Sequence, residues 1–267
     1  MTNRVRAKVY LVGAGPGDPE LLTVKALRLI RNADVVVYDR LVAPSILELI
    51  PPDTQRVFVG KESGCHPVPQ AAINQLLVEL ARSGQTVVRL KGGDPVIFGR
   101  GCEEGEHLVR NCIGFEIVPG ITAASGCAAM AGIPLTHRAA ASGVRFVTGH
   151  RLEDRSLDLN WRSLADPDTT LVVYMGLSNL TEIAQRLIAA GLPETTPAIA
   201  IASGTTERQK LCRATLLDLP ARVAAAGLTA PALFIIGRVV AVSDPLRDAF
   251  DTADAWLATF EAEASHA

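Results

Sequence analysis

The stretch Val9–Leu27, VYLVGAGPGDPELLTVKAL, joins an apolar strand to a glycine-rich turn and then to a helical pattern. This order is typical of the start of a nucleotide-binding α/β domain. The loop departs from the dinucleotide fingerprint G-x-G-x-x-G in two ways, since Pro16 lies inside it and Asp18 replaces the third glycine. A carboxylate at Asp18 would repel a pyrophosphate at a helix N-terminus. The stretch therefore predicts an α/β domain whose loop holds something other than a dinucleotide.

Short runs rich in valine and isoleucine alternate with amphipathic segments through the first half of the chain. Within Pro69–Gly84 the apolar residues fall at helical spacing, with proline at the start and glycine at the end. The predicted strands are Lys8–Val12, Asp34–Tyr38, Arg56–Val59, Thr86–Leu90 and Phe115–Val118. This alternation predicts a mostly parallel sheet with helices on both faces.

The second half repeats the alternation with an antiparallel element. A short polar turn, SGTTERQK, separates two strand-like runs and predicts a hairpin, and Asn179–Ala190 has the pattern of an amphipathic helix. The predicted strands are Val144–Thr148, Thr170–Met175, Ala198–Ala202, Leu211–Thr215 and Ala232–Gly237. The expected fold is thus two α/β domains, 1–140 and 141–245, the second with a mixed sheet, followed by a helical tail over 246–267.

Composition and charge exclude several classes of protein. The formal net charge of -2 provides no broad basic field, so no nucleic-acid partner is expected. No apolar run approaches the roughly 20 residues of a membrane span, and the N-terminal segment lacks the apolar core of a signal peptide. The five cysteines form no CxxC pair, and the histidines do not lie at zinc-ligand spacing. We expect a cytoplasmic protein with reduced thiols, no metal site and no membrane contact.

Two further glycine-rich segments indicate a ligand site. In Val87–Glu104, VVRLKGGDPVIFGRGCEE, a buried strand ends at Lys91 and two glycines expose the backbone at its carboxyl end, where α/β sheets bind ligands. In Val118–Arg138, Thr122 precedes a helix of small residues that leaves room beside it. Plain turns and close helix packing are the alternative explanations for the two segments.

The ordered set of motifs carries a resemblance over roughly residues 8–242. The motifs are VGAGPGDPELLT, DVVVYDRLV, VFVGKESG, RLKGGDPVIFGRG, VPGITAASGCAAMAGIPLTHR, VTGH, VVYMG, SGTTERQ and PALFIIGRVV. They resemble the tetrapyrrole methyltransferase family, and VYDRLV, FVGK and GIPLTHR are similar to its uroporphyrinogen-III C-methyltransferase branch. Members of this family bind S-adenosylmethionine in a cleft between two α/β domains rather than on a Rossmann sheet, and they are typically homodimers.

The resemblance implies a reaction and a set of site residues. The branch transfers methyl groups to two pyrrole carbons of the tetrapyrrole uroporphyrinogen III, giving precorrin-2 and S-adenosylhomocysteine on the way to sirohaem or cobalamin. Asp39 matches the position of the family's proton acceptor, and Lys61 that of its proton donor. The matching cofactor contacts are Pro16, Gly92, Gly93, Asp94, Ile97, Thr122, Ala123, Met175, Gly204 and Ala232.

The substrate carries many carboxylates, so cations are expected on its side of the cleft, arginine above all because it pairs with carboxylates in a bidentate manner. The motif cations are Arg40, Arg89, Lys91, Arg100 and Arg138. Three other functions remain open: a methyltransferase that acts on a later precorrin, an NAD(P) oxidoreductase in which Asp39 contacts the ribose, and a non-enzymatic module that senses S-adenosylmethionine.

Overall fold

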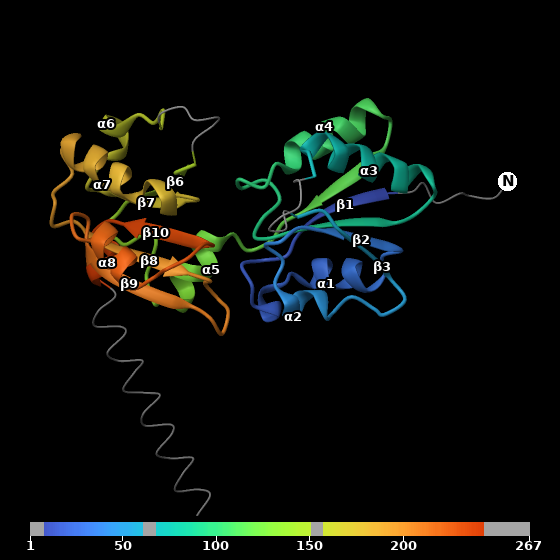
Figure 1. Cartoon of the computed structure of the whole chain (residues 1–267), viewed down its shortest axis with the longest axis horizontal. Helices are drawn as coiled ribbons and strands as arrows, with labels where there is room; N and C mark the ends of the chain where they lie inside the picture. Colours follow the sequence, from blue (N-terminus) through green and yellow to red (C-terminus); the bar gives the residue numbers. More distant parts are fainter. Residues whose placement is uncertain (1–7, 61–67, 151–156, 243–267) are drawn as a thin grey trace, which may run out of the picture. The chain divides into compact units, whose positions relative to one another are not determined.

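The computed structural model describes residues 8–60, 68–150 and 157–242 of the 267-residue chain. The chain divides into two compact units. Unit 1 holds the chain up to Gly126 together with the short segment Gly204–Glu207, and unit 2 holds Cys127–Ser203 and the chain from Arg208 onward. Each unit contains one five-stranded sheet with helices packed against it (Figure 1).

Unit 1 is built on a wholly parallel sheet in the order β3-β2-β4-β1-β5. Its strands are β1 (Lys8–Gly13), β2 (Val35–Tyr38), β3 (Gln55–Phe58), β4 (Val87–Lys91) and β5 (Gly114–Val118). Its helices are η1 (Pro19–Leu21), α1 (Val24–Arg31), α2 (Pro44–Leu47), α3 (Gln70–Arg82) and α4 (Gly101–Arg110). In Figure 1 helices α1 and α2 lie on one face of this sheet and α3 and α4 on the other.

Two apolar cores follow from the alternation of side chains along the buried strands. Val88 and Leu90 of β4 pack with Ile30 of α1 on one face of the sheet. Val87 of the same strand packs with Leu77 of α3 on the other face. The inner strands β1, β2 and β4 are largely buried and contain valine-rich runs, which is why the sequence predicted them correctly.

Unit 2 is built on a mixed sheet in the order β6-β7-β10-β8-β9. Strands β6 (Gly143–Thr148) and β7 (Thr169–Tyr174) are parallel, whereas β10 (Ala232–Ile236), β8 (Pro197–Ala202) and β9 (Lys210–Thr215) pair antiparallel. Its helices are α6 (Trp161–Leu164), η2 (Leu177–Asn179), α7 (Leu180–Ala189), α8 (Leu219–Ala225) and α9 (Val239–Val242). Phe234 is fully buried at the centre of its core.

The observed elements agree closely with the predicted ones. All ten predicted strands are present with ends within one residue of those expected, and the hairpin of β8 and β9 is confirmed. The polar segment between β6 and β7 contains one helical turn, α6, in its described part. The tail predicted over 246–267 lies outside the described residues, as does Lys61. No helix among the described residues is long and apolar enough to cross a membrane.

The division between the units lies at Gly126, earlier than the boundary expected near residue 140. It falls within α5 (Ala123–Met130), whose first four residues belong to unit 1. The residues that follow are bound to unit 2 by arginine side chains. Arg213 of β9 donates to the carbonyl of Ala131, and Arg238 donates to the carbonyl of Ala140. These bonds to backbone oxygens leave no hydrophobic pattern in the sequence, so the prediction missed them.

Cysteine reactivity tests the packing around α5. Burial raises the pKa of the Cys127 thiol to about 11, whereas Cys102 and Cys112 are exposed. Since the thiolate is the reactive form, iodoacetamide at pH 8 should label Cys102 and Cys112 at least about tenfold faster than Cys127. Peptide mass mapping of the native protein measures this, with the urea-unfolded protein as the control. Equal labelling of all three native thiols would contradict the packing.

Candidate active site

Three loops of unit 1 meet at the carboxyl ends of β1, β4 and β5, and glycines lie at the meeting point. A Cβ atom on Gly120 would lie 2.3 Å from the carbonyl oxygen of Gly93 and 2.7 Å from the Cα of Gly13. Gly15 and Gly93 exchange two backbone hydrogen bonds, of 3.1 and 2.7 Å, which tie the first loop to the second. The three backbones therefore pack too closely for any side chain at Gly120.

Asp94 joins two of these loops through its carboxylate. Its Oδ2 accepts a hydrogen bond of 3.1 Å from the Gly120 amide, and its Oδ1 accepts one of 2.9 Å from the Val96 amide. The residue is 8% exposed. Buried carboxylate bonds of this kind are costly to remove. Asp94 thus holds the loop after β4 against the loop after β5.

Asp18, which breaks the dinucleotide fingerprint, caps the short helix η1. Its side chain accepts a hydrogen bond of 2.8 Å from the Glu20 amide, and its own amide donates to the Thr205 hydroxyl at 3.2 Å. A helix-capping aspartate of this kind satisfies backbone donors that have no partner within the helix. The aspartate therefore has a structural role in the first loop, which agrees with the rejection of a pyrophosphate site there.

A cluster of buried charges lies beside the same loops. Arg89 and Lys91 follow Val87 on the side of β4 that faces α3 and α4, and they are only 3% and 4% exposed. Both donate to one oxygen of Glu104 on α4, Arg89 from Nε at 3.1 Å and Lys91 from Nζ at 2.9 Å. Gln70 of α3 donates to the same oxygen at 3.2 Å. Glu104 itself is fully buried.

Asp39 connects this cluster to solvent. Its Oδ2 lies 3.3 Å from Nη2 of Arg89, and its Oδ1 accepts a hydrogen bond of 3.0 Å from the Leu41 amide. The Asp39 side chain is 26% exposed, in contrast to Arg89. The carboxylate is therefore held in place from inside and accessible from outside, which is the geometry that a general base needs.

The burial of Lys91 changes its proton affinity. Desolvation lowers the pKa of Lys91 below its usual value of 10.5, and the nearby positive charge of Arg89 lowers it further. Glu104 and Asp39 oppose this shift but do not cancel it. Lys91 and Arg89 thus differ from ordinary surface cations, because both are buried and both are already hydrogen-bonded to Glu104 inside unit 1.

The predicted site residues fall into three groups. The loop edge of unit 1 carries Pro16, Gly92, Gly93, Asp94, Ile97, Thr122, Ala123 and Gly204. Met175 and Ala232 belong to unit 2, where Met175 follows Tyr174 and Ala232 precedes its partner Leu233, so both lie at the same end of the paired strands β7 and β10. Of the predicted cations, Arg40, Arg100 and Arg138 are exposed, whereas Arg89 and Lys91 are buried.

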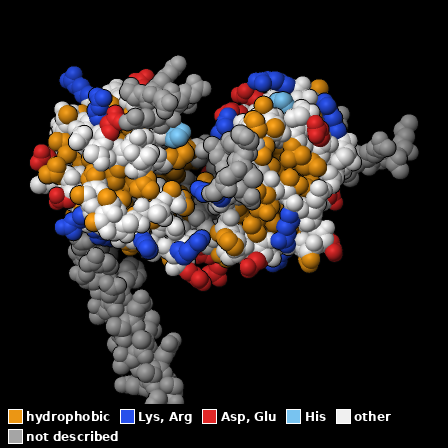
Figure 2. Space-filling model, viewed as in Figure 1, with side chains coloured by type: hydrophobic (Ala, Val, Ile, Leu, Met, Phe, Trp, Pro, Cys, Tyr) orange, Lys and Arg blue, Asp and Glu red, His pale blue; other side chains and the backbone are white. Residues whose placement is uncertain are grey.

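Apolar side chains are exposed beside these positions. Leu41 and Phe98 in unit 1 are 56% and 41% exposed, and Met175 in unit 2 is 49% exposed. Figure 2 shows apolar side chains among charged ones on the visible surface of each unit. Exposed large apolar side chains close to arginines suit a ligand that combines an apolar body with negative charges.

Strained backbone is concentrated in the same segments. Five of the six non-glycine residues with positive φ in the described chain lie here, namely Phe98, Arg100, Met175, Ser203 and Thr205, with φ between 49° and 62°, and the sixth is Cys112 after α4. Side chains other than glycine rarely adopt this conformation, and such residues cluster at functional sites. The strain thus lies in the loops that the sequence selected for ligand binding.

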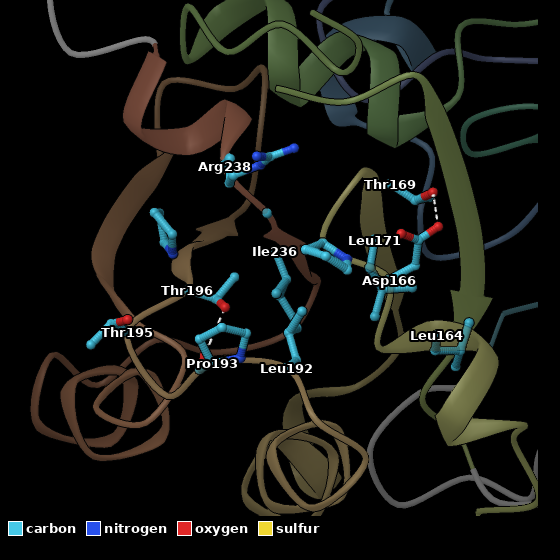
Figure 3. A pocket seen from close by; sticks show the side chains of 13 residues that line it. Leu164, Asp166, Thr169, Leu171, Leu192, Pro193, Thr195, Thr196, Ile236 and Arg238 are labelled. Atoms are coloured by element: carbon cyan, nitrogen blue, oxygen red, sulfur yellow. Dashed lines mark hydrogen bonds between the residues drawn. The ribbon is translucent and has the colours of Figure 1, made fainter. Parts of the chain in front are cut away.

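A cavity of about 220 Å³ lies in unit 2 (Figure 3). Its walls include Thr169 and Leu171 at the start of β7 and Ile236 at the end of β10. Met175 and Ala232 lie at the opposite edge of that sheet. The Asp166 carboxylate at the cavity is already hydrogen-bonded to the Thr169 hydroxyl at 2.6 Å. The cavity is therefore not part of the candidate site.

Residues 8–220 match the model of the family described as Tetrapyrrole (Corrin/Porphyrin) Methylases. The chain belongs to this family. Its two-unit α/β fold agrees with solved structures. A uroporphyrin III C-methyl transferase from Thermus thermophilus is 43% identical with a TM-score of 0.75, and the match covers 88% of this chain and all of that one. A cobalt precorrin-4 methyltransferase is 28% identical with a TM-score of 0.80, covering 90% of this chain and 98% of that one.

Curated relatives are more similar in sequence. Siroheme synthase from Nitrosospira multiformis is 58% identical over 236 residues, which are 88% of this chain and 50% of that protein. The chain thus spans about half the length of the siroheme synthases that it matches. Uroporphyrinogen-III C-methyltransferase from Paracoccus denitrificans is 55% identical over 237 residues, which are 89% of this chain and 83% of that protein.

Glu104 and Gln70 were not among the predicted site residues. The signal for Glu104 was present, because it shares the buried face of α4 with Leu108, where an apolar residue is expected. A lone glutamate on such a face indicates a buried partner. Gln70 left no comparable signal, since glutamine at the start of a helix is ordinary.

We predict that Gly120→Ala destabilises unit 1 by about 2 kcal/mol, because its Cβ would overlap the backbones of Gly13 and Gly93. Gly114→Ala is the matched control, since a Cβ there would meet no atom within 4 Å in the described structure. Its effect should stay within about 0.5 kcal/mol. Urea unfolding measures both, and equal stabilities of the two variants would contradict the close packing.

We predict that Lys91 makes stability depend on pH in the alkaline range. Its folded-state pKa is lowered, so above that pKa and up to about 10.5 the unfolded state binds more protons and stability rises with pH. Lys91→Met should lack this rise. The difference in urea midpoint between wild type and Lys91→Met, measured from pH 7 to 10.5, isolates the effect. A difference that is constant with pH would contradict it.

Proposed function

We propose that the chain is an S-adenosylmethionine-dependent methyltransferase that methylates uroporphyrinogen III at two pyrrole carbons to give precorrin-2, for sirohaem or cobalamin biosynthesis. The observation that carries the proposal is the likeness to the uroporphyrin-III C-methyl transferase of Thermus thermophilus complexed with S-adenyl homocysteine. It is 42% identical with a TM-score of 0.74, and the match covers 88% of this chain and all of that one. The 55% identity to the Paracoccus denitrificans enzyme supports the same substrate.

The loops of unit 1 fit the methyl donor. A Cβ on Gly93 would make only ordinary van der Waals contact, with the Ala123 amide nitrogen at 3.9 Å and the Thr122 Cα at 4.0 Å, so peptide groups of two predicted contact segments lie beside each other there. Such groups suit the polar edges of an adenosyl compound, and glycines let it approach the backbone. Met175 of unit 2, another predicted cofactor contact, is 49% exposed.

Bound S-adenosylmethionine supplies an electrophilic methyl carbon on a sulfonium. Attack of a pyrrole carbon on this methyl would release S-adenosylhomocysteine and would require the loss of one proton from the macrocycle. The protein therefore has to align the two reactants, exclude water and accept the proton. Asp39 suits the last task, since its carboxylate is fixed by Arg89 and Leu41 yet partly exposed. Lys61, proposed as the proton donor, lies outside the described residues.

The exposed cations suit the carboxylates of the substrate. Arg100 forms a bidentate pair with Glu103, and both side chains are half-exposed, so a substrate carboxylate could exchange for Glu103. We assign Arg40, Arg100 and Arg138 to substrate contact. Arg89 and Lys91 are buried, so we propose that they act behind the substrate-binding surface, where Arg89 holds the Asp39 carboxylate.

A later precorrin as substrate is the second candidate. The TM-score of 0.80 with the cobalt precorrin-4 methyltransferase favours it, but the identity of 28% is lower than that to the uroporphyrin III enzymes. We also propose that the protein is cytoplasmic and that it forms a homodimer. Light scattering of the purified protein tests whether it is a dimer.

The decisive experiment is an anaerobic incubation of the purified chain with uroporphyrinogen III and methyl-labelled S-adenosylmethionine. The expected product is precorrin-2 with two labelled methyl groups, identified by mass spectrometry and NMR. Absence of methylation on this compound, together with methylation of a later precorrin, would support the second candidate and reject the first.

We predict that Asp39→Ala lowers kcat about 10²–10⁴-fold, as expected for loss of a general base, and leaves the affinity for S-adenosylhomocysteine within about threefold. Gly92→Val should lose both turnover and affinity for S-adenosylhomocysteine, because a Cβ there would lie 2.7 Å from the Cβ of Leu41 and displace the loop after β2. Calorimetry and initial rates measure the two quantities. Wild-type turnover in Asp39→Ala would reject the role of Asp39.

A further inference from the structure

Glu104 is the only carboxylate within hydrogen-bond reach of both buried cations of β4 in the part of the chain that the structure describes. One oxygen, Oε1, accepts from Arg89, Lys91 and Gln70 at 3.1, 2.9 and 3.2 Å. The other, Oε2, is buried and has no partner among the described residues. Because one oxygen accepts from all three side chains, their donor atoms converge on a single position between β4, α3 and α4.

Arg89 reaches from this point to Asp39. Its Nε is bound to Glu104, its Nη1 donates to the Leu90 carbonyl at 3.1 Å, and its Nη2 is 3.3 Å from Asp39. A guanidinium is planar, so fixing two of its nitrogens determines where the third one points. The position of Asp39 at the edge of the site thus depends on an anion that itself has no exposed surface.

The charges explain why an anion is required at this position. Without Glu104, Arg89 and Lys91 would be two buried cations facing each other, with Asp39 as their nearest remaining acid. Glu103 is the next acid on α4, but it is exposed and bound to Arg100. His107, one turn after Glu104, has a buried Nε2 with no partner in the described residues. A buried pair that loses one partner costs far more than an exposed pair.

We propose that Glu104 is a positioning residue: its buried carboxylate holds Arg89 and Lys91 together at the carboxyl end of β4, and through Arg89 it fixes the Asp39 carboxylate for proton transfer. This inference rests on the proposed methyltransferase function for its kinetic consequence. The structural part, the fixation of Arg89 by Glu104, is independent of that function.

The first test needs no activity. In ¹⁵N NMR spectra of the wild-type protein, the Nε–H proton of Arg89 should exchange with water at least about tenfold more slowly than that of exposed Arg110, because it is buried and bound to Glu104. Glu104→Gln should remove most of this protection, and Asp39→Asn should retain it. Rapid exchange in the wild type, or full protection in Glu104→Gln, would overturn the inference.

The second test separates positioning from stability. Glu104→Gln keeps the volume of the side chain but removes its charge, and it should lower kcat about 100-fold while KM for S-adenosylmethionine changes less than threefold. In an Asp39→Asn background the same substitution should cost less than about threefold, because the two residues act in one chain. The rate of single-turnover transfer of labelled methyl groups is measured with and without Glu104→Gln in both the wild-type and the Asp39→Asn background. An equal loss in both would show a general structural effect and reject the proposal.

Glu106→Gln is the matched control. Glu106 lies on the same helix, pairs with Arg110 at 3.0 Å and is exposed, so its substitution should leave kcat within twofold of wild type. A loss similar to that of Glu104→Gln would reject the specific role of the buried carboxylate.

A charge-balanced pair keeps the test valid if Glu104→Gln does not fold. Glu104→Gln with Lys91→Met removes one anion and one cation, and its kcat is compared with that of Lys91→Met alone. The proposal expects about a 10-fold or greater loss between these two proteins, and equal kcat values would overturn it. If folded wild-type protein lacks methyl transfer altogether, the proposed function fails while the exchange measurement still decides the fixation of Arg89.

Discussion

The packing of three glycine backbones at the carboxyl ends of β1, β4 and β5 is the constraint on which the site depends. Gly13, Gly93 and Gly120 lie so close that a single Cβ at Gly120 would overlap both neighbours. Because the strands are parallel, all three loops leave the sheet on the same side. The close contact brings peptide groups from distant parts of the sequence to one edge, and Asp94 holds the arrangement through two backbone amides.

The second feature of unit 1 is a buried charge cluster continuous with an apolar core. On one side of β4, Val88 and Leu90 belong to a hydrophobic cluster with Ile30 of α1. On the other side the row begins with Val87 and continues with Arg89 and Lys91, which meet Glu104. The same strand therefore contributes apolar residues to the core and, toward its carboxyl end, charged residues to the candidate active site. Burying these charges is unfavourable in itself, so their presence fits a functional role rather than a stabilising one.

Much of the fold was predictable from the sequence, for a physical reason. The inner strands β1, β2 and β4 of unit 1 are largely buried, so their apolar runs identify them without knowledge of their neighbours. The hairpin of unit 2 was equally local, since a short polar turn joins its strands. The unit boundary was placed too late because the segment after Gly126 is held by arginine bonds to backbone carbonyls at Ala131 and Ala140.

The sequence by itself determined the order of strands and helices, the glycine loops and the membership in a family, because these depend on local patterns and on motifs that stand in a fixed order. Only the tertiary structure decided that Arg89 and Lys91 are buried, that Asp18 caps a helix and that Glu104 unites the charges beside Asp39. These facts depend on distances between residues far apart in the chain. The lone glutamate on the buried face of α4 indicates that it has a partner, but no local pattern identifies Arg89 and Lys91 of β4 as that partner.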